Sequence, residues 1–242
     1  MQWRRLLPVV SMAATAFWVS APNARANIVI FSGGDAGANS TDPRPISNAT
    51  AAAFDAATGP NSLITFESAP LGSFTNLTVA PGVTINGSDI SGNPQTILNA
   101  PFATPDSLFG YNTTAGGSHF VSLFGGTLTF SFATPIDAFG GYFTGVQNGG
   151  ETITFSDGSS QSIPLLALGG EGGVQFLGFT DFGKSIASVT INVPGDIIGV
   201  DDVRYLTAPL SPVPEPSTWG LLATVFVGIV LSLRQRRNAS VC

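Results

Sequence analysis

Cysteine and histidine are almost absent from this chain, which has one of each in 242 residues. Because Cys242 is the single thiol, no disulfide can form within the chain, and zinc sites, which need several Cys, His and carboxylate ligands, are disfavoured. A Ser-His-Asp triad would have to use His119, and no nucleophile-elbow pattern accompanies it. We therefore expect no enzymatic activity. A carboxylate pair for glycoside hydrolysis stays open, because the distance between carboxylates depends on tertiary structure.

Basic residues are scarce in the middle of the chain. Of the nine lysines and arginines, six lie in segments 1–26 and 217–242, which contain no acidic residue. Segment 27–216 therefore has three basic and fifteen acidic residues and a net charge of −12, against −6 for the whole chain. A segment this acidic repels nucleic acid and anionic membranes, so nucleic acid is excluded as a partner. It is compatible with divalent cations.

The first 26 residues have the three parts of a secretory signal peptide. Arg4 and Arg5 form a positive region, residues 6–19 are mostly apolar, and Ala24-Arg25-Ala26 is a cleavage site of the A-x-A type. We predict cleavage before Asn27 and export by the general secretion route. Segment 1–26 is therefore not expected to be part of the folded domain.

An apolar run near the C-terminus predicts a transmembrane helix. The 15 residues from Trp219 to Leu233 carry no charge. This is shorter than the roughly 20 residues that a full span prefers, a mismatch that bilayer thinning can absorb. Arg234, Arg236 and Arg237 follow the run and should remain cytoplasmic as a membrane stop, within a basic tail over 234–242. The linker over 207–218 would then lie on the far side of the membrane.

The linker contains a short motif, Val213-Pro214-Glu215-Pro216. Together with the apolar run and the arginines, it resembles the PEP-CTERM sorting signal of Gram-negative bacteria. Members of that family are processed by an exosortase, a membrane transpeptidase, and generally accompany exopolysaccharide production. The resemblance implies an exported protein with a transient inner-membrane anchor, which then reaches the cell surface or the extracellular space. It also implies an exosortase as a partner and a link to exopolysaccharide or biofilm.

The body of the chain, residues 62–206, is predicted to be all-β. Short runs rich in Phe, Ile, Val and Thr alternate with Gly, Asn, Asp and Pro, and Thr127–Phe132 alternates apolar and polar side chains. About eight to ten such runs predict a single antiparallel β-sandwich rather than alternating βα units. The expected strands are 63–66, 83–85, 127–132, 139–146, 152–155, 161–165, 176–179, 186–193 and 200–205, with turns at Asn86-Gly87, Asn148-Gly149 and Asp157-Gly158.

Segment 27–61 is expected to be an N-terminal arm with one short helix. The arm opens with an apolar stretch, Ile28–Phe31, and an alanine-rich helix is predicted over 49–57. Ser47 or Asn48 would be the N-cap of that helix.

Motifs in the second half of the body are similar to those of jelly-roll domains common in PEP-CTERM proteins, which are themselves similar to galactose-binding-like sandwiches. The resemblance therefore implies a jelly-roll-like fold. Its motifs are Gly141-Tyr142-Phe143, Ile153–Gly158, Phe176–Phe179, Ile186–Ile191 and Gly199–Val203, together with Ile64–Ser68 upstream.

The same resemblance implies a calcium site. Glu67 follows the first body strand, and Asp201 and Asp202 lie in the last one. In jelly rolls of this type these strands are often neighbours, and hard oxygen ligands there hold calcium. The resemblance favours Glu67 with Asp201 over Asp202, because adjacent side chains on a strand point to opposite faces. The alternative is that these acids accept backbone hydrogen bonds or face solvent.

Aromatic side chains are candidate sugar-binding groups, because aromatic rings stack on sugars. All three tryptophans, Trp3, Trp18 and Trp219, lie in the targeting segments. Tyr111, in a polar loop, is the candidate stacking platform, and most of the phenylalanines are expected in the core because of their alternation. We therefore expect a non-catalytic structural or interaction protein of the cell surface or extracellular matrix. The alternatives are a carbohydrate-binding module with a structural calcium ion and a secreted hydrolase.

Overall fold

The computed structural model describes residues 28–166 and 170–208. The predicted signal peptide, sorting motif, transmembrane helix and basic tail lie outside these ranges. Within the described ranges, no helix is both long enough and apolar enough to cross a membrane.

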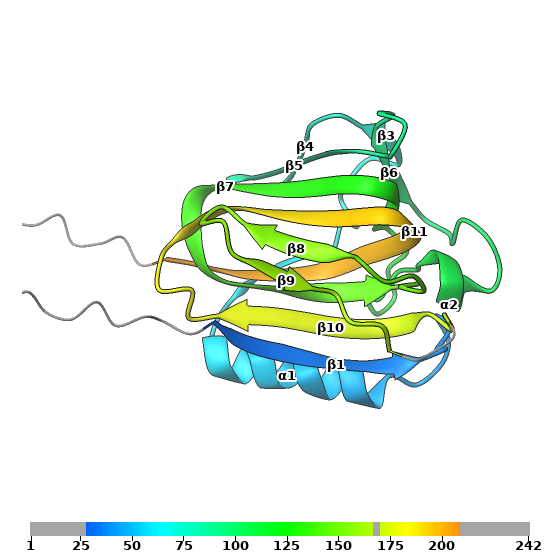
Figure 1. Ribbon diagram of the computed structural model, residues 1–242, viewed down its shortest axis with the longest axis horizontal. Helices are drawn as coiled ribbons and strands as arrows, with labels where there is room; N and C mark the ends of the chain where they lie inside the picture. Colours follow the sequence, from blue (N-terminus) through cyan, green and yellow to red (C-terminus); the bar gives the residue numbers. More distant parts are fainter. Residues whose placement is uncertain (1–27, 167–169, 209–242) are drawn as a thin grey trace, which may run out of the picture.

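Eleven strands of the described residues form one continuous sheet. Figure 1 shows how the labelled strands are arranged. The mostly-β body predicted from the sequence is confirmed, and there are two helices among the described residues. The elements are β1 Val29–Ala36, α1 Pro45–Thr58, β2 Ser62–Ile64, β3 Gly72–Phe74, β4 Leu77–Ala80, β5 Val83–Ser88, β6 Gln95–Leu98, α2 Asp106–Phe109, β7 Phe120–Thr144, β8 Thr152–Phe155, β9 Ser160–Ser162, β10 Gly173–Thr180 and β11 Ile186–Thr207.

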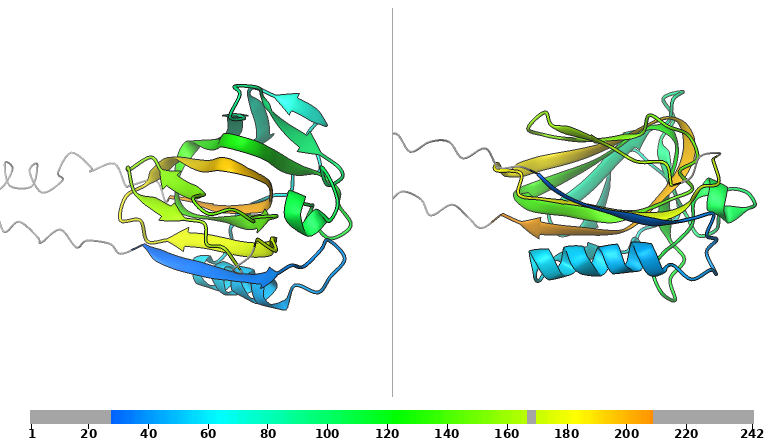
Figure 2. Two further views of the ribbon diagram at one scale, coloured as in Figure 1. Left: turned by 45° about the vertical axis from the view of Figure 1, so that its right-hand side comes forward. Right: turned by 60° about the horizontal axis from the view of Figure 1, so that its bottom comes forward.

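Two long bent strands, β7 and β11, make the sheet curl (Figure 2). The first part of β11 pairs with the first part of β7, with Val189 opposite Phe130. The last part of β11 pairs with the last part of β7, with Tyr205 opposite Phe139. In both stretches the residue numbers of β7 fall as those of β11 rise, so the paired segments run in opposite directions. The runs predicted as separate strands at 186–193 and 200–205 are therefore parts of one strand.

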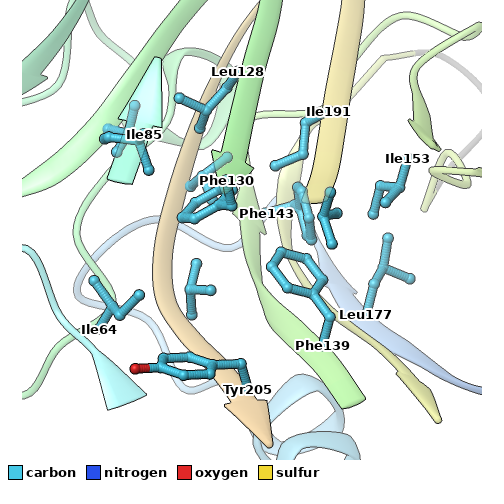
Figure 3. Packing of buried hydrophobic residues seen from close by; sticks show 14 of the residues in the cluster. Ile64, Ile85, Leu128, Phe130, Phe139, Phe143, Ile153, Leu177, Ile191 and Tyr205 are labelled. Carbon is cyan, nitrogen blue, oxygen red and sulfur yellow. The ribbon is translucent and has the colours of Figure 1, made fainter. Parts of the chain in front are cut away.

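The main core lies inside the curl (Figure 3). Phe130 and Phe139, from the two parts of β7, have ring centroids 5.6 Å apart. Phe155 on β8 and Phe179 on β10 are in similar contact at 5.3 Å. Each fully buried phenylalanine contributes about 1.5–3 kcal/mol to stability, so these contacts hold the curled sheet closed.

The N-terminal segment belongs to this sheet and is not a separate arm. β1 pairs with β10 over its full length, from Val29 opposite Thr180 to Ala36 opposite Gly173. Helix α1 covers the outer face, where Phe54 is fully buried and its ring centroid lies 5.5 Å from that of Phe176. The boundary predicted at residue 61 therefore does not separate two folding units.

Helix α1 contains the predicted helix but begins earlier, at Pro45, and its cap differs from the prediction. Its N-cap residue, Arg44, makes no side-chain capping bond. The carboxylate of Asp35, at the end of β1, accepts hydrogen bonds from the backbone N–H groups of Ile46 (3.1 Å) and Ser47 (2.9 Å). The cap predicted at Ser47 or Asn48 is thus supplied from outside the helix.

One of the three predicted turns is wrong. Asn86-Gly87 lies inside β5, where Gly87 stands opposite Leu128 of β7. A side chain at position 87 would collide with the carbonyl oxygen of Thr127, so glycine is needed for close approach of two strands rather than for a turn. The turn at Asp157-Gly158 is confirmed, with the Gly158 N–H donating to the Phe155 carbonyl at 2.9 Å.

The start of β1 and the end of β11 lie at the same end of the sheet (Figure 1). Val29 is opposite Thr180, Thr180 is opposite Ala138, and Ala138 is opposite Leu206. With neighbouring strands about 4.8 Å apart, Val29 and Leu206 are separated by roughly 14 Å. Helix α2 and the loops around it lie at the other end of the sheet, which we call the distal end.

Candidate functional site

A ten-residue loop at the distal end, Gly110–His119, is held by carboxylates on both sides. On one side, Asp201 Oδ2 accepts hydrogen bonds from the backbone N–H groups of Thr113 (2.6 Å) and Thr114 (3.2 Å). Asp202 Oδ1 accepts one from the Thr114 hydroxyl at 2.7 Å. We call this segment the 110–119 loop.

Glu67 holds the other side of the same loop. Its Oε1 accepts hydrogen bonds from the backbone N–H groups of Ser118 (2.9 Å) and His119 (3.0 Å) and from the Asn112 side-chain amide (2.9 Å). The imidazole Nδ1 of His119 lies 3.1 Å from the carbonyl oxygen of Ala69. The three acids singled out in the sequence therefore do meet one loop, but Glu67 and the aspartate pair bind different parts of it.

The two aspartates point the same way, against the expectation for adjacent residues of a strand. Asp202 has a left-handed backbone (φ 46°), which interrupts the alternation of side chains. As a result, Asp201 and Asp202 each place a carboxylate oxygen 3.1 Å from the Thr113 hydroxyl. Burial, with the charge of Asp202 as a second cause, raises the pKa of Asp201 to about 7.

The environment of Glu67 does not suit a calcium ligand. Its carboxylate accepts N–H donors, whose partial positive charge disfavours a cation. Asp201 also accepts N–H donors, but there the neighbouring Asp202 carboxylate adds a second negative charge. Across residues 28–166 and 170–208, no cluster of three or more His, Cys, Asp and Glu side chains could hold a metal ion. The oxygen-rich part of the predicted site consists of Asp201, Asp202 and the hydroxyls of Thr113 and Thr114.

Tyr111 is not a stacking platform, because its ring is buried. Only 1% of the residue is exposed, and its hydroxyl donates to the Ala38 carbonyl at 2.8 Å. The preceding residue, Gly110, has a φ of +78° and packs directly against the backbone of Gly199, so the loop turns the ring inward. This burial also raises the pKa of the Tyr111 hydroxyl.

The ring exposed at the distal end is that of Phe102, an exception to the expectation that most phenylalanines lie in the core. The residue is 55% exposed and is the one aromatic among the exposed large apolar residues that the structure describes. Its ring meets that of Phe124 edge-on at 4.8 Å and lies 6.3 Å from that of Phe109. The sequence contains a signal for this exposure, because Phe102 stands in a Pro-, Ala- and Thr-rich segment without apolar periodicity.

Among the described residues, two cavities open at the distal end. One, of about 350 Å³, lies beside the 110–119 loop and is lined by Arg44, Asn99, Asn112 and Ser118 among others. The other, of about 360 Å³, lies beside Phe124. A third cavity, of about 580 Å³, lies at the opposite end of the sheet, next to Val29 and Leu206.

Comparison with known proteins concerns mainly the C-terminal segment. Residues 212–237 match the PEP-CTERM protein-sorting motif. The match confirms the resemblance stated above and includes the Pro-Glu-Pro core, the apolar run and the three arginines. It indicates an exported protein with a C-terminal membrane anchor before exosortase processing. These residues lie outside the described ranges.

The body has more distant similarities. No curated protein matches the chain. A solved structure of TmCBM61 in complex with β-1,4-galactotriose is 13% identical, and the alignment covers 60% of this chain and 94% of that chain with a TM-score of 0.26. A similarity at this level assigns neither a ligand nor a binding site to the present protein.

Proposed function

We propose that the protein is an exported, exosortase-processed component of the cell surface or extracellular matrix, and that its jelly-roll-like body acts by binding rather than by catalysis. The observation that carries the proposal is the sorting motif at residues 212–237. The body ends at its C-terminal side in β11, directly before the segment that contains this motif.

The position of the start of β1 and the end of β11 supports a display role. The end of β11 lies beside Ala138 in the row of paired residues that also contains the start of β1. A linker that leaves from this end would place the anchor below the sheet and the distal loops away from the membrane. The proline-rich composition of segment 207–218 suits an extended spacer between the body and the membrane.

The positions of the Glu67 and Asp201 carboxylates favour a binding role over a hydrolytic one. Glu67 and Asp201 hold the 110–119 loop through backbone N–H groups. Neither residue is among those that line the described cavity beside this loop. A general acid or base must reach a substrate atom within hydrogen-bond distance, so these two acids suit a structural role.

The partner that we favour is the exopolysaccharide that generally accompanies PEP-CTERM systems. A neutral polysaccharide suits segment 27–216, with its net charge of −12, better than an anionic one, because like charges repel. A second candidate is a carbohydrate-binding module with a structural calcium ion, which the buried pair Asp201 and Asp202 favours, since a cation would offset their charge.

Sorting can be tested in the producing cells. We would replace Pro214, Glu215 and Pro216 with alanine and follow the protein in inner-membrane, surface and medium fractions. The expected result is that the wild-type chain leaves the inner membrane with a shortened C-terminus, whereas the triple variant stays there at full length. Ser211→Ala, just outside the matched segment, is the control. Equal release of the triple variant and the wild type would reject exosortase processing at this motif.

A further inference from the structure

The cavity beside Phe124 arises where two strands leave regular pairing at the same place. In β7, Gly125 and Gly126 both have left-handed backbones, with φ of +70° and +73°. In β11, the partner of Gly126 is Val193 and the next paired residue, Ile197, faces Phe124. Three residues of β11, 194–196, thus stand opposite Gly125 alone and bulge out of the sheet. A side chain at position 126 would collide with the Ser88 carbonyl, so the geometry requires glycine there.

The bulge is held in place by Asp196, which is almost fully buried. Its Oδ2 accepts hydrogen bonds from the backbone N–H groups of Gln147 (2.7 Å) and Asn148 (3.0 Å), and its Oδ1 accepts one from that of Ile197 (2.8 Å). The Gln147 side-chain amide in turn donates to the Leu108 carbonyl of α2 at 2.9 Å. The walls of the cavity are therefore joined to each other before any ligand arrives.

One wall of this cavity is apolar and is formed by Phe109, Phe124 and Ile90. Ile90 is 69% exposed, although its turn is fixed by Asp89, whose carboxylate accepts the Ser91 N–H at 2.7 Å. Phe102 is not itself among the residues that line the cavity, but its exposed ring packs edge-on against Phe124 of this wall. Exposed apolar side chains that adjoin one another, as Ile90 and Phe102 do around the half-buried Phe124, are typical of contact surfaces.

The other wall is polar and is formed by Gln147, Asn148, Gly195 and Asp196. Asn148 is exposed, and its side-chain amide donates to the Gly195 carbonyl at 3.1 Å, which sets its orientation. Amide groups both donate and accept hydrogen bonds, as sugar hydroxyls do. We call the space between these two walls the bulge groove.

We propose that the bulge groove binds one pyranose residue of a neutral polysaccharide, with Phe102 as the stacking ring. The inference rests on the proposed function and specifies its site. A pyranose has an apolar C–H face, which suits an aromatic ring, and equatorial hydroxyls, which suit the amide wall. A cavity of about 360 Å³ is at the small end for ligand sites and fits a single sugar unit better than a large ligand. The Asp196 carboxylate and the acidic body disfavour anionic polysaccharides.

The full chain in detergent can be tested by affinity electrophoresis in gels that contain β-1,4-galactan, galactomannan, mixed-linkage β-glucan or, as the anionic comparison, alginate. The wild type should be retarded by at least one of the three neutral polymers and not by alginate. Phe102→Ala should weaken that binding at least about tenfold, the range of an interface hot spot. Phe102→Tyr keeps the ring and should bind within about threefold of the wild type, well under the tenfold step of 1.4 kcal/mol.

Leu63→Ala is the matched control, since Leu63 is similarly exposed on β2, away from the groove, and should bind like the wild type. If Phe102→Ala fails to fold, Ile90→Ala on the same wall gives the same readout. Wild-type affinity in a folded Phe102→Ala protein, or no retardation by any neutral polymer, would overturn the inference. Either result leaves the sorting proposal intact, because release from the inner membrane is measured independently of Phe102.

Discussion

Asp201 and Asp202 each place a carboxylate oxygen 3.1 Å from the same hydroxyl, that of Thr113. One hydroxyl has one proton and can donate to only one of them at a time. Both residues are buried, so their charges repel each other in a region of low dielectric. A bound cation or a proton would relieve this repulsion.

Calcium should therefore stabilise the protein at this pair. We expect millimolar calcium to raise the melting temperature, and we expect Asp202→Asn to abolish the rise. Glu67→Ala should behave differently: it should lower stability by about 2 kcal/mol, since backbone N–H groups lose their acceptor, and the loss should be the same with and without calcium. Differential scanning calorimetry with calcium and with a chelator measures both effects. An unchanged wild-type melting temperature would remove the calcium site.

Glu151 should make stability fall as the pH rises. The residue is fully buried, and neither carboxylate oxygen has a hydrogen-bond partner among the described residues. Burial, and to a lesser extent the charge of Asp196, raises its pKa. When folding raises the pKa of a carboxyl group, that group stabilises the folded state fully at pH values below its unfolded pKa. This contribution to the free energy of unfolding is lost as the pH rises through the folded pKa. Because this contribution is lost, the melting temperature should decrease from about pH 5 to pH 8.

Glu151→Leu should reduce this dependence, leaving the part due to Asp201, whose pKa is raised to about 7. It should also stabilise the protein at pH 8 by about 1 kcal/mol, because an unpaired polar group leaves the interior. The exposed Glu171→Leu is the control and should keep the wild-type slope. Thermal unfolding monitored by circular dichroism across this pH range measures the slopes. Identical slopes for Glu151→Leu and the wild type would show that Glu151 is not the titrating group.

Asp35 should matter more for stability than its position at the end of β1 suggests. Besides two backbone N–H groups of α1, its carboxylate accepts a hydrogen bond from the Ser47 hydroxyl at 2.8 Å. Asp35→Ala should cost about 1–2 kcal/mol, the usual range for loss of a helix cap. The exposed Asp42→Ala, whose carboxylate binds only Asn39 three residues away, should cost less. Urea unfolding of the two variants compares these costs, and equal effects would contradict the capping role.

Two glycines with left-handed backbones should differ sharply when changed to alanine. Gly126→Ala meets the carbonyl of Ser88, whereas Gly116→Ala, at nearly the same φ, meets no atom within 4 Å. Gly116→Ala should cost about 1 kcal/mol, the backbone penalty alone. Gly126→Ala should cost more than that and should also weaken binding in the bulge groove. Urea unfolding and affinity electrophoresis measure the two effects, and equal stability of the variants would mean that the β7 bulge relaxes without cost.

Local patterns predicted the strands well where the side chains alternate. Thr127–Phe132 lies in β7 and Thr152–Phe155 is β8 as expected, because period-two alternation follows from one buried face. The role of β1 was missed, since its partner β10 lies more than a hundred residues away in the chain. The cap of α1 was missed for a similar reason, because Asp35 is not adjacent to the helix.

The sequence by itself determined the sorting signal, the acidic charge of the body and its β content, because each depends on composition or on neighbouring residues. Tertiary structure alone decided which side chains are available at the distal end. Tyr111 is buried because Gly110 turns it against Gly199, and Phe102 is exposed because its segment passes outside the sheet beside Phe124. Burial depends on contacts between residues far apart in the chain, which no local pattern specifies.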